Sequence, residues 1–165
     1  MPRREATPAE AKALSNPLRL RILRLCLDQA LTNKQLADRL DKDPATVLHH
    51  VRTLVDTGFL AAEPVRAGAT GALEKPYLAT GKSWEISVGD DPESVLAPID
   101  ALRAEVLEAG DDAVVTMFRV GPRLSARHKK ELVAKLHELA EEYAFLSDKG
   151  GEPLGLSVVL HRRRP

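Results

Sequence analysis

The sequence predicts a mainly helical fold with a small amount of β-structure (α+β). Two short capped helices follow one another within residues 32–57, and two strand-like segments follow them directly. Aromatic residues make up 4% of the chain, so Leu, Val and Ala must build the core. Such a composition favours helix packing over a β-sandwich.

A supporting helix is expected to begin near residue 17. Ser15 and Asn16 are good capping residues, and Pro17 suits the first helical position because its missing amide would have no partner there. The single cysteine, Cys26, excludes an intrachain disulfide and is expected to be a small buried hydrophobe. The apolar side of this helix carries Leu18, Ile22, Leu25 and Cys26.

The next two helices carry clear start and stop signals. Thr32 and Gln35 form a capping box, in which each side chain accepts from the other residue's amide. After a polar break, Asp43 is expected to cap a second helix with Pro44 at its first position. Gly58 ends that helix, because glycine adopts the left-handed conformation at little cost.

The second helix of the pair, about residues 44–57, has two different faces. Its outer face carries short polar side chains, and a helix with such a face fits a major groove about 12 Å wide. The alternative is a helical bundle whose polar face meets only water. The expected buried stripe is Val47, Leu48, Val51, Leu54 and Val55, and the outer residues are Ala45, Thr46, His49, His50, Arg52 and Thr53.

A hairpin is predicted for residues 59–80, where two strand-like segments flank a turn with two glycines. A hairpin placed directly after the second helix is a wing, so residues 1–88 are expected to form a winged helix-turn-helix DNA-binding domain. Arg66 near the tip and Lys75 on the return strand are candidate contacts to backbone phosphate or the minor groove. Simple solvation of these cations is the alternative.

Four segments of this half of the chain resemble the winged-helix regulators of the ArsR-like type. The resemblance implies a dimeric repressor or activator whose second helix enters the major groove. Carried over by position, Thr46, His49 and His50 are the base-facing residues, and Lys34, Gln35, Arg52 and Thr53 are supporting contacts. The segments are LSNPLRLRILRLC (14–26), TNKQLADRL (32–40), ATVLHHVRTLVDTGFL (45–60) and EKPYLATGKSW (74–84).

The two adjacent histidines favour mildly pH-sensitive binding. A neutral imidazole can donate to a phosphate or a base acceptor, and it becomes cationic near its ordinary pKa of about 6.5. Under the alternative interpretation, His50 packs against the preceding helix and only His49 contacts DNA.

The net charge of zero predicts modest nonspecific affinity for DNA. Residues 1–90 carry 13 Lys and Arg against 11 Asp and Glu, and residues 91–165 carry 11 against 13. Neutralising phosphates is the main source of sequence-independent binding. Specific binding is therefore expected to depend on dimerisation and on fit to the groove.

Residues 89–165 are predicted to form a small helix-strand-helix-strand domain for dimerisation. A helix from Asp91 to Ala109 is followed by strands at 113–121 and 154–163, with a long helix from about 125 to 147 between them. Convergent polar groups for a pocket are not evident, so a small-molecule effector stays an open alternative. The long helix carries a stripe of Leu132, Leu136, Leu139, Ala140 and Tyr143.

The same sequence disfavours several other functions. It has no glycine-rich phosphate loop or nucleophile elbow, so no catalytic residue and no enzyme activity are predicted. One cysteine cannot form a thiolate cluster, and the helix bearing His128, His137, Glu138 and Glu141 is interpreted as a solvated charged face. We therefore expect no metal site and no cofactor.

No apolar run approaches the roughly 20 residues of a membrane span, so a cytoplasmic protein with no membrane partner is expected. Together these features predict a homodimeric, sequence-specific regulator, a repressor, bound to a double-stranded DNA operator. Two alternatives stay open: a winged helix used only for protein contact, and a ligand- or metal-sensing regulator that uses the C-terminal domain.

Overall fold

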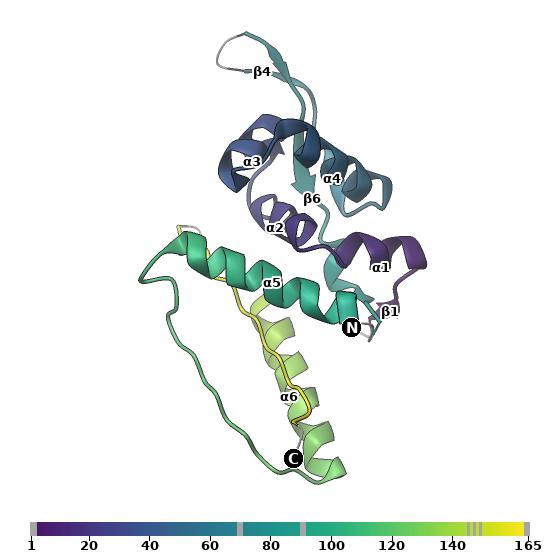
Figure 1. The fold of residues 1–165 in the computed structure, drawn as a ribbon, viewed down its shortest axis with the longest axis vertical. Coiled ribbons are helices and arrows are strands. Elements are labelled where there is room, and N and C mark those ends of the chain that lie inside the picture. Colours follow the sequence, from purple (N-terminus) through teal and green to yellow (C-terminus); the bar gives the residue numbers. More distant parts are fainter. Residues whose placement is uncertain are drawn as a thin grey trace. The chain divides into compact units, whose positions relative to one another are not determined.

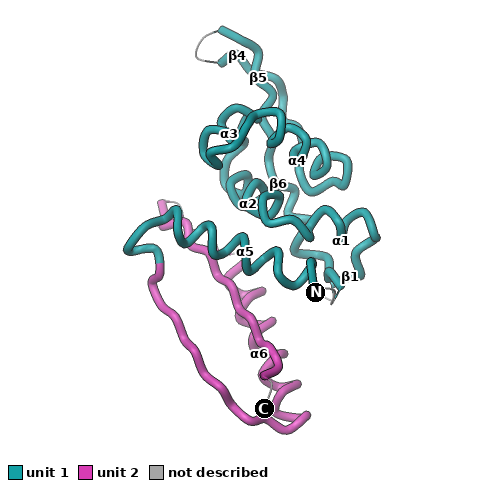
Figure 2. Tube along the Cα trace, in the orientation of Figure 1, with its two compact units in different colours: residues 1–113 teal, residues 114–165 magenta. Residues whose placement is uncertain are grey.

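The computed structural model describes residues 3–68, 71–89, 92–144, 146, 148 and 150–163. The chain forms two compact units, residues 1–113 and residues 114–165, coloured separately in Figure 2. The fold is mixed α and β, as the sequence predicts.

The first unit contains most of the regular structure in the described residues (Figure 1). Its helices are α1 (Pro8–Leu14), α2 (Pro17–Leu25), α3 (Asn33–Leu40), α4 (Pro44–Asp56), the 3-10 helix η1 (Lys82–Trp84) and α5 (Pro92–Ala109). Its strands are β1 (Arg4–Glu5), β2 (Leu31–Thr32), β3 (Leu60–Ala62), β4 (Arg66–Ala67), β5 (Leu73–Glu74), β6 (Pro76–Ala79) and β7 (Ile86–Ser87). The second unit contributes α6 (Ala126–Ala144).

The predicted caps of the helix pair are confirmed. The Thr32 hydroxyl accepts from the Gln35 amide at 3.2 Å, and the Gln35 side chain accepts from the Thr32 amide at 2.9 Å. α2 begins as predicted, with the Asn16 side chain accepting from the Arg19 amide at 3.1 Å. Gly58, at φ +75°, ends α4. These local bonds fix where each helix starts and stops before any tertiary packing is considered.

The core of the first unit lies between α2, α3, α4 and the first strand of the hairpin. Val47, Val51 and Leu54 of the predicted stripe are buried, while Leu48 and Val55 are half-buried. The inward faces of the neighbouring helices and of β3 complete this core. Its buried residues are Ala13, Leu14, Ile22, Leu23, Cys26, Leu31, Leu36, Ala37, Leu40, Val47, Val51, Leu54, Phe59, Leu60 and Ile86.

The wing forms as predicted, and a short third strand joins it. β3 and β2 both pair antiparallel with β6, with Leu60 opposite Ala79 and Leu31 opposite Tyr77. The hairpin continues outward as the β4–β5 pair. Gly71 near the tip adopts φ +79°, a conformation that side chains other than glycine rarely take.

An ionic cluster around Glu10, which the sequence alone does not predict, connects the start of the chain to the residues that follow the wing. The buried Glu10 carboxylate accepts from both terminal nitrogens of Arg4, at 2.7 and 2.9 Å, and lies 2.8 Å from Lys82 Nζ. It also accepts from the Thr7 amide at 2.8 Å in a capping box. These hydrogen bonds, that with Arg4 foremost, hold the pKa of Glu10 well below its usual range.

Replacing Glu10 by glutamine is expected to destabilise the first unit at neutral pH, because Arg4 and Lys82 would no longer share an anion. Since folding lowers the pKa of Glu10, its contribution is present above the pKa of about 4.3 of an unfolded Glu and is lost as pH falls below that value. Thermal denaturation at pH 7 and pH 3 measures this, with exposed Glu5→Gln as control. A melting-temperature difference from wild type that stays equal at both pH values would contradict the ionic role.

Helix α5 packs against α2 and α1 and belongs to the first compact unit. The domain boundary predicted from the sequence lies after residue 88 and would place this helix in the C-terminal domain. Arg24 Nε lies 3.8 Å from Glu105 Oε2, and Arg21 pairs with Glu108. Burial raises the pKa of Glu105. That residues 89–165 act together as a dimerisation part remains a prediction.

In the second unit, the predicted long helix is present and the two predicted strands are not. Residues 113–121 and 154–163 form no strand, and Val115, Phe118 and Leu154 are largely exposed. Their β-branched and apolar residues favour extended backbone, but a strand also needs a neighbour for its amides and carbonyls. The prediction of strands at residues 113–121 and 154–163 was therefore wrong.

Candidate nucleic-acid interface

The start of α4 is held by two side chains. Asp43 Oδ1 accepts from the amides of Ala45 at 2.8 Å and Thr46 at 3.2 Å, so these amides already have an anionic partner. The Asn33 side chain donates to the Pro44 carbonyl at 2.9 Å and so connects the first turn of α3 to that of α4. Asn33 is not among the residues that the sequence predicts for the site, although a short polar side chain directly after a threonine cap was the available signal.

The outer face of α4 is open. Thr46, His49 and Arg52 are exposed, while Val47 and Val51 are buried on the other side of the helix. Positions 46, 49 and 52 are three residues apart, so these side chains fall on one side of the helix. The arrangement offers hydroxyl, imidazole and guanidinium groups to a partner that approaches from outside.

Thr53 and Gln35 each have one polar atom in use within the helix pair. The hydroxyl of the half-buried Thr53 donates to the His49 carbonyl at 3.1 Å, and the Gln35 side-chain oxygen is occupied by the capping box. Lys34, at the start of α3, is exposed. Of the predicted supporting side chains, Lys34 and Arg52 are therefore the more accessible.

The two adjacent histidines have different surroundings. His50 is half-buried, and its Nδ1 lies 3.5 Å from Nη1 of Arg19 in α2. Burial, followed by the positive charges of Arg19 and His49, lowers the pKa of His50. The lowered pKa favours the neutral form of the half-buried His50 ring. The neighbouring His49 lies on the exposed face of α4.

The two wing cations also differ. Arg66 Nε lies 3.7 Å from Glu74 Oε2, on the residue that faces it across the β4–β5 pair. Lys75 instead lines a groove of about 240 Å³ between α4 and β6, together with Arg52 and Tyr77. The structure thus places Lys75 beside α4 and gives Arg66 an acidic partner within the wing.

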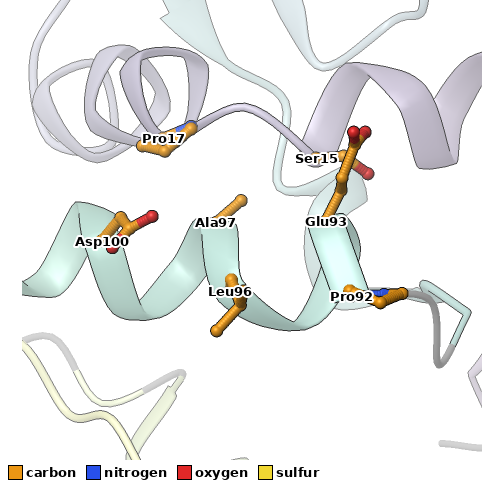
Figure 3. Close-up of a pocket in the computed structure, with 7 residues that line it drawn as sticks. All are labelled: Ser15, Pro17, Pro92, Glu93, Leu96, Ala97 and Asp100. Carbon is orange, nitrogen blue, oxygen red and sulfur yellow. The ribbon is translucent and has the colours of Figure 1, made fainter.

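A second depression lies between the α1–α2 junction and α5. It has a volume of about 250 Å³, and Figure 3 shows Ser15 and Pro17 on one side and residues of α5 on the other. The polar groups from α5 are two carboxylates, which do not by themselves define a ligand class. The lining residues are Ser15, Pro17, Pro92, Glu93, Leu96, Ala97 and Asp100.

Within the described residues, no three His, Cys, Asp or Glu side chains lie close enough together to hold a metal ion. Cys26 is fully buried, and burial raises the pKa of its thiol to about 11. None of the helices in the described ranges combines the length and the apolar character of a membrane span.

Comparison with known proteins gives one matching domain model and several structural neighbours. A family model described as a helix-turn-helix domain matches residues 14–63. No curated protein matches the chain. The similarity to individual solved structures is weak, because identities are 20% or less and TM-scores lie below 0.4.

Three of these structures illustrate the range. Reduced HlyU from Vibrio cholerae is 20% identical over 55% of this chain and 80% of that one, with a TM-score of 0.37. A mutant of ZitR from Lactococcus lactis is 17% identical over 76% and 73%, with a TM-score of 0.36. The transcriptional regulator SlyA is 17% identical over 76% and 72%, with a TM-score of 0.33.

The match to the family model and the geometry agree. Residues 14–63 include α2, α3, α4 and β3, which are the supporting helix, the helix pair and the first strand of the wing. The first unit therefore contains a winged helix-turn-helix with an open outer face on its second helix.

Proposed function

We propose that the protein is a homodimeric, sequence-specific regulator of transcription, a repressor of the ArsR-like type, that acts in the cytoplasm on a double-stranded DNA operator. One observation supports this most directly. The outer face of α4 is exposed at Thr46, His49 and Arg52, with a hairpin directly beside it. A face of this kind fits a major groove, while the hairpin lies along the backbone or minor groove.

Within this proposal, Thr46 and His49 contact base edges. Both are exposed, and the Asp43 cap together with the Asn33 contact holds the turn from which they extend. Arg52 and Lys34 are placed to contact phosphates, which positions the helix without specifying sequence. Gln35 and Thr53 contribute through the atoms not used inside the helix pair.

His50 has an indirect part in the same proposal. Its half-buried ring and its contact with Arg19 place it between α2 and the exposed face. A neutral His50 supports the orientation of α4, and it reaches DNA only at the margin of the interface.

The direct experiment is a gel-shift assay with the full chain, followed by selection of bound sequences from a random DNA pool. Two recognition helices in successive major grooves predict a near-palindromic site with half-sites about 10 base pairs apart. Recovery of no preferred sequence, with no shift of genomic fragments, would refute the proposal. It would leave the winged helix as a module for protein contact.

The two wing cations give a further prediction. Arg66→Gln and Lys75→Gln should each weaken binding to operator and random DNA alike, because phosphate contacts carry no sequence information. The slope of log K against log salt should flatten by about 0.9 for each phosphate that is no longer neutralised. Glu74→Gln should act in the opposite direction, since it releases Arg66 from its partner.

The matched control for these charge changes is Lys12→Gln, an exposed cation on α1. Binding is measured by fluorescence anisotropy across a salt series. Unchanged slopes for both wing variants would remove the wing from the DNA interface and leave α3 and α4 to form it.

A further inference from the structure

Helix α6 is an amphipathic helix whose apolar side is incompletely covered. It runs for 19 residues, and none of them is buried. Its apolar side nevertheless has a regular pattern, since Leu132, Leu136, Leu139 and Tyr143 are separated by four, three and four residues. This is the alternation of a two-helix coiled coil, in which such a stripe is covered by another helix. Leu139 is 44% exposed and Tyr143 is 56% exposed.

The charges of α6 are arranged against its own dipole. Residues 126–135 carry four Lys or Arg and one Glu, whereas residues 136–144 carry three Glu and no Lys or Arg. The first turn has no acidic residue, and the last turn has no basic residue. Because cations are unfavourable near a helix N-terminus and anions near its C-terminus, this arrangement destabilises an isolated helix.

An antiparallel second helix with the same sequence corrects both features at once. It covers the apolar stripe, and it sets the basic half of each helix against the acidic half of the other. We propose that α6 pairs antiparallel with α6 of a second copy of this chain and forms a subunit contact of the homodimer. The inference deepens the proposed function, whose homodimer it builds on, by naming the interface.

The sequence defines one register for this pair. When Leu136 meets the partner's Leu139, Leu132 meets the partner's Tyr143, and the four apolar side chains of each helix all find an apolar counterpart. In the same register Lys135 lies beside the partner's Glu142, at the flanking positions that carry salt bridges in coiled coils. Twofold symmetry repeats each of these contacts, as expected for an isologous interface.

The flanking side chains agree with this register. Lys135 and Glu142 are both exposed, so both are accessible to a partner. On the other side of the stripe, Val133 would meet the partner's Ala140, and these half-buried residues extend the apolar contact. One register thus gives apolar layers in the centre, apolar pairs on one side and opposite charges on the other.

The charge pattern also selects among occupants of the stripe. An anionic membrane surface would attract the basic half of α6 and repel the acidic half, so it would not stabilise the whole helix. A partner helix with a single sign of charge would be attracted to only one half of α6 and repelled by the other half. A second copy in antiparallel orientation satisfies both halves because it carries the same asymmetry in reverse.

The test uses the full chain and a charge swap, with the dimer dissociation constant measured by sedimentation equilibrium. Lys135→Glu and Glu142→Lys each place like charges together at two symmetry-related positions, and each should raise the dissociation constant about tenfold. The double variant Lys135→Glu with Glu142→Lys restores opposite charges and should return it to within a few-fold of wild type. The matched control is Lys130→Glu, which makes the same charge change at an exposed position of α6 away from the stripe.

A second variant tests the apolar layers. Leu139→Asp places a charge in the centre of the pair and should lower dimer affinity by at least about a hundredfold, while circular dichroism reports whether the rest of the chain stays folded. A chain that is monomeric at all concentrations, or dimerisation that is insensitive to both the charge swap and Leu139→Asp, overturns the inference. A monomer that binds anionic vesicles through α6 overturns it as well.

Dimerisation and DNA binding are measured separately, so the two proposals can fail independently. If the charge-swap variants change the dimer dissociation constant but the protein shifts no DNA in the gel assay, the α6 interface is supported and the proposed regulator function is refuted. If the protein binds DNA with sequence specificity but its dimer dissociation constant does not respond to the charge swap, the regulator function is supported and the α6 interface is refuted.

Discussion

Replacing Thr46 and His49 together by alanine is expected to reduce the preference for operator over random DNA by about 1 to 3 kcal/mol for each base that α4 no longer reads. Both side chains extend from the exposed face of α4, away from the buried Val47 and Val51, so their removal should leave the core intact. Affinity should fall further on the operator than on random DNA, because the nonspecific affinity comes from phosphate contacts. Competition anisotropy with the selected operator and a scrambled duplex measures the ratio.

Two controls accompany the double variant. Gln29→Ala changes an exposed polar residue in the loop before β2 and should leave the ratio unchanged. His50→Ala should have a smaller effect than His49→Ala, because the half-buried His50 ring faces Arg19. An operator preference that survives the removal of both Thr46 and His49 would show that other residues specify the sequence.

The parts of the fold that could be predicted from the sequence are those fixed by local chemistry. Thr32 with Gln35, and Asp43 with Pro44, determine where α3 and α4 begin, and Gly58 ends α4. Each of these signals acts within a few residues along the chain, so no knowledge of the tertiary fold is needed to interpret it. The buried apolar stripe of α4 was predictable for the same reason, because the spacing of apolar residues along a helix indicates which face is buried.

The missed features depend on partners that are distant in sequence. The capping box at Thr7 and Glu10 was visible locally, but the pairing of Glu10 with Lys82 required the wing to bring Lys82 back to α1. In the same way, the wing register sets Glu74 opposite Arg66, and this decides how much free charge the tip presents. A single sequence does not rank such long-range pairings.

The strand predictions failed for a related reason. The pattern in residues 113–121 favours extended backbone, yet a strand exists only where a neighbour accepts its hydrogen bonds. In the structure Val120 and Phe118 are exposed instead. Local pattern specifies the backbone that a segment prefers, and the partner has to come from the rest of the fold or from another molecule.

Replacing Phe59 by alanine is expected to lower the free energy of unfolding of the first unit by about 3 to 5 kcal/mol, a large part of the roughly 5 to 15 kcal/mol that holds a typical domain together. Phe59 is 1% exposed, and its amide donates to the Leu54 carbonyl at 2.8 Å where α4 turns into the wing. Lys82 Nζ lies 5.3 Å from the centre of its ring, so the substitution also removes a cation–π interaction.

Urea denaturation measures this destabilisation, and the reactivity of the buried Cys26 thiol provides an independent signal from the same core. Phe118→Ala is the matched control, because that ring is 86% exposed and should contribute within about 0.5 kcal/mol. Since Phe59 joins the end of α4 to the hairpin, the alanine variant should also bind the operator more weakly at temperatures where it remains folded. Equal stabilities for the two phenylalanine variants would mean that the α4–wing junction does not depend on this core.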